Sequence, residues 1–246
     1  MERLAAKRVA VLSDVHGNAV ALAAALSELA GCEPDLVVFG GDLTWGPLPE
    51  ETLALVAGLD VPALFVRGNA ESALLEPPNE PTEREQWLLA RHSEDALALL
   101  STFAESVSVD VGGLGHVRFC HGSPRSDQEI VTPKTPPARM RALTAGIDER
   151  TLVTAHTHIQ FDRRVAGVRS VNAGSVGMPY EDRAGAYWAL LGPDVDFRRT
   201  GYPVEDAIQR YRTSGDPLAE QMVELLVRPP AREELIEHGE KLEFSD

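Results

Sequence analysis

Seven side chains that could bind divalent cations occur in short motifs spread over much of the chain. In order, they are Asp14, His16, Asp42, Asn69, His121, His156 and His158. Carboxylate, imidazole and amide oxygen atoms together suit borderline or hard ions such as Mn²⁺, Fe²⁺ or Zn²⁺, whereas a thiolate site would need more cysteines than Cys32 and Cys120. Ions of this kind polarise phosphoryl oxygens and acidify water. The set therefore predicts a metal site suited to hydrolysis.

Each motif alone also has a purely structural explanation. Asp14 could cap a following helix, the Gly-Asp and Gly-Asn pairs could be ordinary turns, and a single histidine is more often structural than a ligand. His156 and His158 could be two exposed strand residues. On extended backbone, however, side chains at i and i+2 point the same way, so this pair could serve neighbouring ions. The joint occurrence of the motifs favours the metal site.

Predicted strands precede these motifs. Apolar segments that read as strands lie at 8–12, 35–39, 61–66, 116–120 and 151–154. Segments 19–30 and 50–59 read as helices, and repeated strand-loop-helix units favour parallel strands with covering helices. Loops at the carboxyl ends of such strands meet in one crevice, where we expect the candidate ligands to converge.

In the second half of the chain, the pattern of strands alternating with helices gives way to short successive strands. Further strands are expected at 106–111, 163–171, 185–191 and 195–200, mostly joined by short turns and paired antiparallel. From residue 203 the chain is expected to form amphipathic helices that end at Asp246 and lie at the periphery.

One domain spanning residues 1–246 is expected, with a helical insertion at about 76–104 and the peripheral helical segment at about 203–246. Within the insertion, residues 82–103 read as one long or two short helices. This insertion could form a lid beside the site and determine the choice of substrate.

Composition limits the partners. Lys and Arg number 23 against 38 Asp and Glu, so the formal net charge is −15, which disfavours extended nucleic acid but still allows a small phosphorylated substrate at a cationic site. Two cysteines are too few for a disulfide framework and favour a reducing, cytoplasmic location. The longest apolar run, residues 19–26, is too short to span a membrane, so neither secretion nor membrane insertion is expected.

The ordered motifs, from Asp14-x-His16 to His156-x-His158, resemble those of the calcineurin-like metallophosphoesterases over about residues 9–176. The resemblance implies an α/β fold, a four-layered α/β/β/α sandwich of two mixed sheets flanked by helices. It also implies two metal ions: Asp14, His16 and His158 bind one, Asn69, His121 and His156 bind the other, and Asp42 bridges both. Two ions about 3.5–4 Å apart can clamp a phosphoryl group and supply a metal-bound hydroxide for in-line attack.

One motif departs from the family pattern. Many members have Gly-Asn-His in the third motif, and that histidine protonates the leaving oxygen, whereas this chain has Gly68-Asn69-Ala70-Glu71. Loss of a general acid typically costs about 10²–10⁴-fold and matters most for poor leaving groups. The resemblance thus shifts toward the small bacterial phosphodiesterase-like branch. Glu71 could compensate through a water molecule, but a charge at a helix N-terminus is the favoured explanation.

Three further residues are candidates for substrate binding. Ser123 could donate a hydrogen bond and Arg125 could bind a phosphate as a fork, although the segment also reads as a surface turn. Asn18 could orient the substrate or simply cap a helix. Residues 172–177 resemble the family's closing loop, which supports the scaffold rather than catalysis.

The sequence therefore predicts a dinuclear metal-dependent phosphoesterase acting on phosphodiester or nucleotide phosphoanhydride bonds, with Asp42 and Asn69 as central catalytic residues. Candidate cofactors are two ions of Mn, Fe, Zn, Ni or Co, with Mn favoured. A phosphomonoesterase or Ser/Thr protein phosphatase is the alternative within enzymes, and a noncatalytic protein-binding scaffold is the alternative of another class. The oligomeric state does not follow from the sequence.

Overall fold

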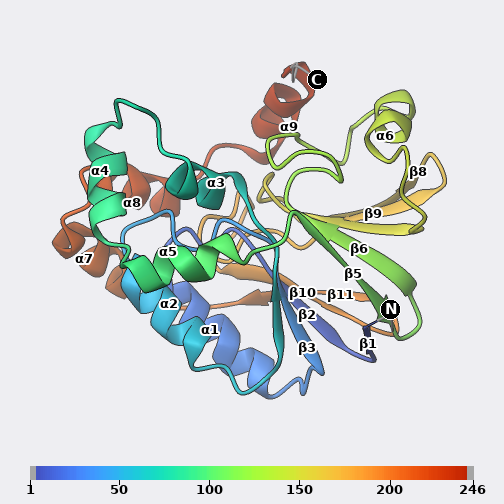
Figure 1. Ribbon diagram of the computed structural model, residues 1–246, viewed down its shortest axis with the longest axis horizontal. Helices are drawn as coiled ribbons and strands as arrows, with labels where there is room; N and C mark the ends of the chain where they lie inside the picture. Colours follow the sequence, from blue (N-terminus) through green and yellow to red (C-terminus); the bar gives the residue numbers. More distant parts are fainter. Residues whose placement is uncertain (1–3, 243–246) are drawn as a thin grey trace.

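The computed structural model describes residues 4–242, and two mixed β-sheets lie face to face at its centre (Figure 1). The five-stranded sheet has the order β11 (Val195–Thr200), β10 (Ala186–Leu191), β2 (Val9–Leu12), β3 (Leu36–Phe39) and β4 (Ala63–Phe65). The six-stranded sheet has the order β1 (Ala5–Ala6), β5 (Ser106–Val111), β6 (Gly115–Cys120), β7 (Thr151–Thr154), β9 (Val168–Asn172) and β8 (Phe161–Val165).

The central strands are apolar on both faces because each face is covered. Val9 and Val11 of β2 pack with residues of the six-stranded sheet such as Phe119, whereas Ala10 and Leu12 pack with the helices on the other side. Since side chains alternate between the two faces of a strand, one short apolar segment contributes to two cores. Buried parallel strands are continuous hydrophobic runs for this reason.

Helices cover the outer faces of both sheets. Figure 1 shows α1 (Ala19–Ala30) and α2 (Pro49–Ala57) below the five-stranded sheet, while α6 (Pro137–Leu143) packs on the outer face of the six-stranded one. The other helices are α3 (Asn69–Leu75), α4 (Glu83–Ala90), α5 (Glu94–Ser101), α7 (Val204–Ser214), α8 (Ala219–Val227) and α9 (Arg232–Lys241). The predicted α/β/β/α sandwich of two mixed sheets is confirmed.

Strand pairing in the second half differs from the expectation. The single strand predicted at 163–171 is a hairpin of β8 and β9, because Ala166 and Gly167 adopt positive φ angles of 54° and 86° and reverse the chain. The antiparallel pairing expected there holds for β5–β6, β8–β9 and β10–β11, but β6–β7 and β7–β9 pair parallel. Because β6 and β7 are parallel, their carboxyl ends lie at one edge of the six-stranded sheet. The residues that follow them lie beside those that follow β2 and β3 (Figure 1).

The C-terminal helices α7 and α8 pack their apolar faces against α1. Tyr211 of α7 is fully buried, and Ile208 and Met222 pack with Ala19 of α1 in one apolar cluster. Both helices lie at one side of the molecule and bury their apolar faces there (Figure 1), and the peripheral character of the segment stays a prediction. The last helix, α9, ends at Lys241, and the predicted extension to Asp246 lies outside the described residues.

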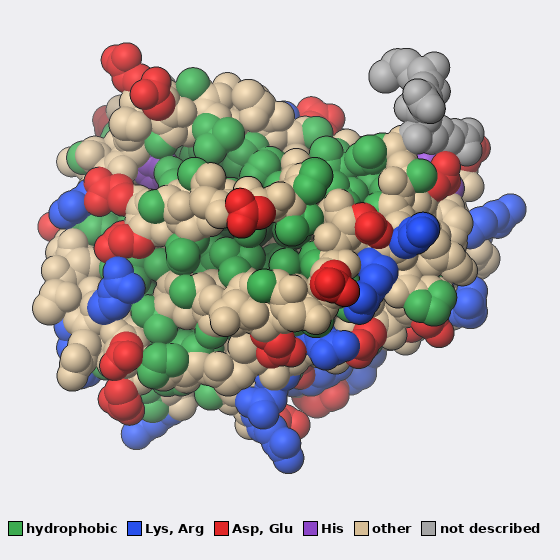
Figure 2. Space-filling view, turned by 90° about the horizontal axis from the view of Figure 1, so that it is seen from below, with side chains coloured by type: hydrophobic (Ala, Val, Ile, Leu, Met, Phe, Trp, Pro, Cys, Tyr) green, Lys and Arg blue, Asp and Glu red, His purple; other side chains and the backbone are tan. Residues whose placement is uncertain are grey.

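The outer surface mixes charges of both signs. On the face shown in Figure 2, Lys and Arg side chains alternate with Asp and Glu side chains around a central area of hydrophobic side chains. Within residues 4–242, no helix is both long enough and apolar enough to cross a bilayer.

Candidate metal centre

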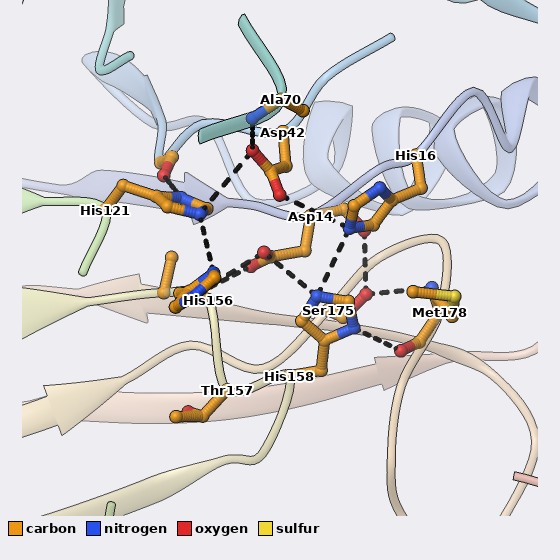
Figure 3. A network of polar contacts seen from close by, with 12 residues as sticks. Asp14, His16, Asp42, Ala70, His121, His156, Thr157, His158, Ser175 and Met178 are labelled. Carbon is orange, nitrogen blue, oxygen red and sulfur yellow. Dashed lines mark hydrogen bonds and ion pairs between the residues drawn. The ribbon is translucent and has the colours of Figure 1, made fainter. Parts of the chain in front are cut away.

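All seven predicted ligands come from loops or helix starts that follow strands. Asp14 and His16 follow β2, Asp42 follows β3, and Asn69 begins α3 after β4. From the second sheet, His121 follows β6, while His156 and His158 follow β7. Figure 3 shows Asp14, Asp42 and the four histidines pointing toward one another from these separate loops.

The first cluster contains Asp14, His16 and His158, all of which are buried. The Nε2 atoms of His16 and His158 lie 3.2 Å apart, and Oδ1 of Asp14 lies 3.2 Å from Nε2 of His158. Ligand atoms about 2.0–2.2 Å from one ion lie roughly 2.9–3.5 Å from each other at tetrahedral or octahedral angles. The donor atoms of this cluster are spaced as ligands of one cation.

The second cluster contains Asp42, His121 and His156, with Asn69 beside it. Nε2 of His121 lies 3.2 Å from Nδ1 of His156 and 3.0 Å from Oδ1 of Asn69. These separations also suit ligands of one ion, here with two imidazole nitrogens, an amide oxygen and a carboxylate.

Asp42 lies between the clusters with one carboxylate oxygen toward each (Figure 3). Its Oδ2 atom is 3.6 Å from Nε2 of His16, and its Oδ1 atom is 3.5 Å from Nε2 of His121. The backbone N–H of Ala70 donates to Oδ1 at 2.9 Å and orients the carboxylate. This is the position of a carboxylate that could bridge two cations.

Backbone carbonyls orient three of the imidazole rings. Nδ1 of His16 donates to the carbonyl of Trp45 at 3.2 Å, and Nδ1 of His158 donates to that of Met178 at 2.6 Å. Nδ1 of His121 donates to the carbonyl of Gly40 at 2.8 Å. Such contacts select the tautomer whose Nε2 lone pair points away from the carbonyl, as histidine ligands of metals usually require. The donor set therefore fits two divalent cations.

Burial and the neighbouring charges shift the pKa values of the imidazoles in different directions. Burial and the charge on His121 lower the pKa of His156 to about 4, which keeps its ring neutral and able to act as a ligand. Burial opposes the charged form of His121, but the carboxylate of Asp42 outweighs it and raises the pKa of His121 to about 10. A cation beside Asp42 would take the place of the proton that this carboxylate attracts.

Backbone strain is concentrated at the predicted ligands. Seven of the described residues other than glycine have positive φ, and five of them belong to the set. They are Asp14 (51°), His16 (47°), Asp42 (54°), His156 (66°) and His158 (57°). This conformation costs about 1–3 kcal/mol per residue and persists where the surrounding structure enforces it, commonly at functional sites.

The strain also corrects an expectation about the His-x-His motif. His156, Thr157 and His158 do not continue β7 as extended chain, so the two imidazoles do not point the same way by strand alternation. Instead, the turn sends His156 to the second cluster and His158 to the first. The prediction that neighbouring clusters share this segment agrees with the structure, whereas its geometric reason was wrong.

The residues predicted to bind substrate have partners within the protein. Asn18 is fully buried and caps α1, since its Oδ1 accepts from the N–H of Ala21 at 3.1 Å while its Nδ2 donates to the carbonyl of Gly177 at 3.0 Å. Both nitrogens of the Arg125 fork bond to Glu129, and the hydroxyl of Ser123 donates to the same carboxylate. These contacts favour structural roles, and the predicted role of the three in substrate binding stays a prediction.

Glu71 also has a structural position. Its buried carboxylate accepts hydrogen bonds from the backbone N–H groups of Asp42 (2.9 Å), Leu43 (2.8 Å) and Gly68 (2.8 Å). Burial and the nearby charge of Asp42 raise the pKa of Glu71 to about 7, although these hydrogen bonds act in the opposite direction. Glu71 joins the start of α3 to the loop that carries Asp42, as the helix N-terminal explanation predicts, and these three hydrogen bonds all come from backbone N–H groups.

Residues that the sequence analysis missed form a wall beside the centre. A cavity of about 350 Å³ is lined by His16, Asp42, Asn69 and Ala70 together with Trp45, Ala73, Arg84, Met178, Met222 and Leu225. Arg84 belongs to the predicted insertion, and Met222 and Leu225 belong to α8. No local pattern connects these residues with the motifs, because they meet only through packing of the C-terminal helices.

Comparison with known proteins agrees with this geometry. The family model of the calcineurin-like phosphoesterase superfamily domain matches residues 8–192, and no curated protein matches the chain. The solved structure of a metallophosphoesterase from Sphaerobacter thermophilus is 26% identical, covers 90% of this chain and 99% of that chain, and has a TM-score of 0.72. The hypothetical protein PH1004 from Pyrococcus horikoshii OT3 shares the fold at 19% identity, covering 91% of this chain and 99% of that one, with a TM-score of 0.79.

Proposed function

Since the chain belongs to the calcineurin-like phosphoesterase superfamily, we propose that it hydrolyses phosphodiester or nucleotide phosphoanhydride bonds of a small phosphorylated substrate with the help of two divalent cations. The observation that carries this proposal is the position of Asp42, with one carboxylate oxygen toward each of two buried ligand clusters.

The ligand assignment follows the two clusters. Asp14, His16 and His158 would hold one cation, Asn69, His121 and His156 the other, and Asp42 both. Two divalent cations supply charge neutralisation at phosphorus and activation of a water molecule. The protein's own contribution is to hold these donors rigidly, through the carbonyls of Trp45, Gly40 and Met178 and the N–H of Ala70.

Among the described residues that line the cavity, none besides the proposed ligands offers an acid side chain, which favours substrates with good leaving groups. Ala70 lines the cavity where many family members have a histidine. Apart from the proposed ligands, Arg84 is the one titratable side chain among the residues that line it, and a guanidinium does not give up its proton near neutral pH. A departing phosphate or activated alcohol needs no protein acid, whereas a simple alkoxide does.

Manganese is the proposed native metal, with Fe, Zn, Ni and Co as the other candidates, because two carboxylates and an amide accompany the imidazoles. Both cysteines of the chain, Cys32 and Cys120, are free thiols, which supports the proposed cytoplasmic location. The net charge of −15 supports a small substrate rather than extended nucleic acid.

A comparison of two chromogenic substrates tests the proposal. With Mn²⁺ present, we expect the protein to hydrolyse bis-p-nitrophenyl phosphate with a higher kcat/KM than p-nitrophenyl phosphate. A clear preference for the monoester would make the protein a phosphomonoesterase or protein phosphatase instead. If no activated ester is hydrolysed with Mn²⁺, Co²⁺ or Ni²⁺, while an Asp42→Ala variant still binds a protein partner, a noncatalytic scaffold is the correct function.

A further inference from the structure

The cavity beside the metal centre has a mixed chemical character. Its lining includes the proposed ligands His16, Asp42 and Asn69, where a phosphoryl group would bind. Apart from Arg84, the other lining residues are apolar or aromatic: Ala70, Ala73, Trp45, Met178, Met222 and Leu225. Its volume of about 350 Å³ lies in the range of small-molecule sites. A substrate group next to the phosphoryl group would therefore lie against apolar and aromatic side chains.

Arg84 is the cationic group of this cavity, and its position is fixed. Its Nη2 atom lies 3.0 Å from Oδ2 of Asp216, whose side chain is fully buried. Oδ1 of Asp216 accepts from the N–H of Leu218 at 2.8 Å, so the ion pair ties α4 to the start of α8. The two walls of the cavity that come from distant parts of the chain are thus held together by one buried pair.

The same guanidinium retains an unused donor. Nε of Arg84 is buried and has no hydrogen-bond partner among the described residues. A buried donor without a partner is unfavourable, and a ligand that supplies an acceptor atom would remove this cost. Arg84 lines the cavity, so a ligand bound there lies next to this guanidinium.

We propose that this cavity is the specificity site for the organic group of the substrate, that it accepts a nucleoside, and that Arg84 hydrogen-bonds an acceptor atom of that nucleotide. A nucleoside combines a flat ring for the apolar wall with acceptor atoms for a guanidinium. The inference rests on the proposed function, since the phosphate of the same nucleotide would lie at the metal centre. It gives α8 and the insertion a direct part in substrate choice.

Binding of nucleoside monophosphates tests the site independently of turnover. In calorimetry of the Mn²⁺-loaded protein, adenosine or thymidine 5′-monophosphate should bind at least about tenfold more tightly than methyl phosphate, which has no ring to bury. Leu225→Trp fills the cavity and should abolish this difference. Val227→Trp is the matched control, because Val227 lies on the same helix with 56% of its surface exposed, and it should retain the difference.

A second pair of variants tests Arg84. Arg84→Lys keeps a cation for Asp216 but loses the fixed Nε–H, and should weaken nucleotide binding about tenfold while the affinity for methyl phosphate is unchanged. The control is Arg91→Lys at the end of α4, where the side chain is 42% exposed, and it should leave both affinities unchanged.

The possible outcomes separate this inference from the proposed function. Equal binding of methyl phosphate and both nucleotides, or a nucleotide preference that survives Leu225→Trp, would overturn the inference even if bis-p-nitrophenyl phosphate is hydrolysed. A nucleotide preference that Leu225→Trp removes would support the site even if no phosphodiester is hydrolysed, in which case the proposed reaction alone is wrong.

Discussion

The Nε2 atoms of His16 and His158 face each other at 3.2 Å, although 142 positions separate the two residues in the chain. Each ring already donates its Nδ1 proton to a backbone carbonyl, so in the neutral state both Nε2 atoms present lone pairs. Two lone pairs at this distance repel each other unless a cation lies beside them. A metal ion bound by both Nε2 atoms would be such a cation.

Metal loading should therefore stabilise the fold. At a free Mn²⁺ concentration of about 100 times its dissociation constant, one site contributes about 2.7 kcal/mol and should raise Tm by roughly 5–10 °C. Differential scanning calorimetry with Mn²⁺ and with EDTA measures the difference. His158→Ala should bind one ion fewer by metal analysis, whereas His116→Ala, on the surface of β6, should keep the full number. An unchanged Tm with EDTA would contradict the two-cation centre.

Asp42→Asn should lower kcat for bis-p-nitrophenyl phosphate by at least about 10²-fold without unfolding the protein. The amide keeps the shape of the side chain and one acceptor for the N–H of Ala70, but it loses the charge shared by the two clusters. Circular dichroism checks the fold, and Asp110→Asn serves as a control because Asp110 contacts His116 outside the centre. Activity within tenfold of the unmodified protein would rule out the bridging role.

Gly68→Ala should impair metal binding. A Cβ atom at residue 68 would overlap Oδ1 of Asp42 and lie 3.0 Å from Cε1 of His121, so the two ligands would have to move. We expect metal affinity to fall by about 10–100-fold, the size of effect seen when groups that orient ligands are altered. Gly201→Ala is the matched control, since a Cβ there meets no atom within 4 Å. Equal metal affinities of the two variants would refute the steric argument.

Glu71→Ala should destabilise the protein by about 3 kcal/mol or more, because it leaves three buried backbone N–H groups without their acceptor. Urea denaturation of the metal-free protein measures this loss. Glu105→Ala provides the comparison, since its side chain is 89% exposed and its ion pair with Arg67 should contribute little. A similar free energy of unfolding for both variants would show that Glu71 is not a structural support.

The contribution of Glu149 to the free energy of unfolding should depend on pH. Burial by itself would raise the pKa of Glu149, but the hydrogen bond from Ser108 and the ion pair with Arg118 lower it to about 2. A lowered carboxyl pKa gives stability that is present above the unfolded-state value near 4.5 and is lost as the pH falls toward 2. Glu149→Gln should therefore cost more stability at pH 7 than at pH 3 in urea denaturation. An equal cost at both pH values would contradict the lowered pKa.

The sequence determined the part of this protein that depends on local pattern. Each ligand motif directly follows an apolar strand, and parallel strands place their carboxyl ends at one edge of a sheet, so convergence of Asp14, Asp42 and His121 could be predicted without coordinates. The strand and helix positions of the first half follow from the same alternation of apolar runs and polar loops. The family fold could be predicted from the order of these motifs.

Tertiary structure decided what depends on contacts between distant segments. Asn18, Ser123 and Arg125 have side chains that suit a substrate, yet their partners are a helix end and a nearby carboxylate. Arg84 belongs to no recognisable sequence motif. Its ion pair with Asp216 and the packing of α7 and α8 on α1 bring it to the metal centre. The sequence specifies the chemistry of each side chain. Which partner that side chain contacts depends on packing, which sums many weak contacts over the whole chain.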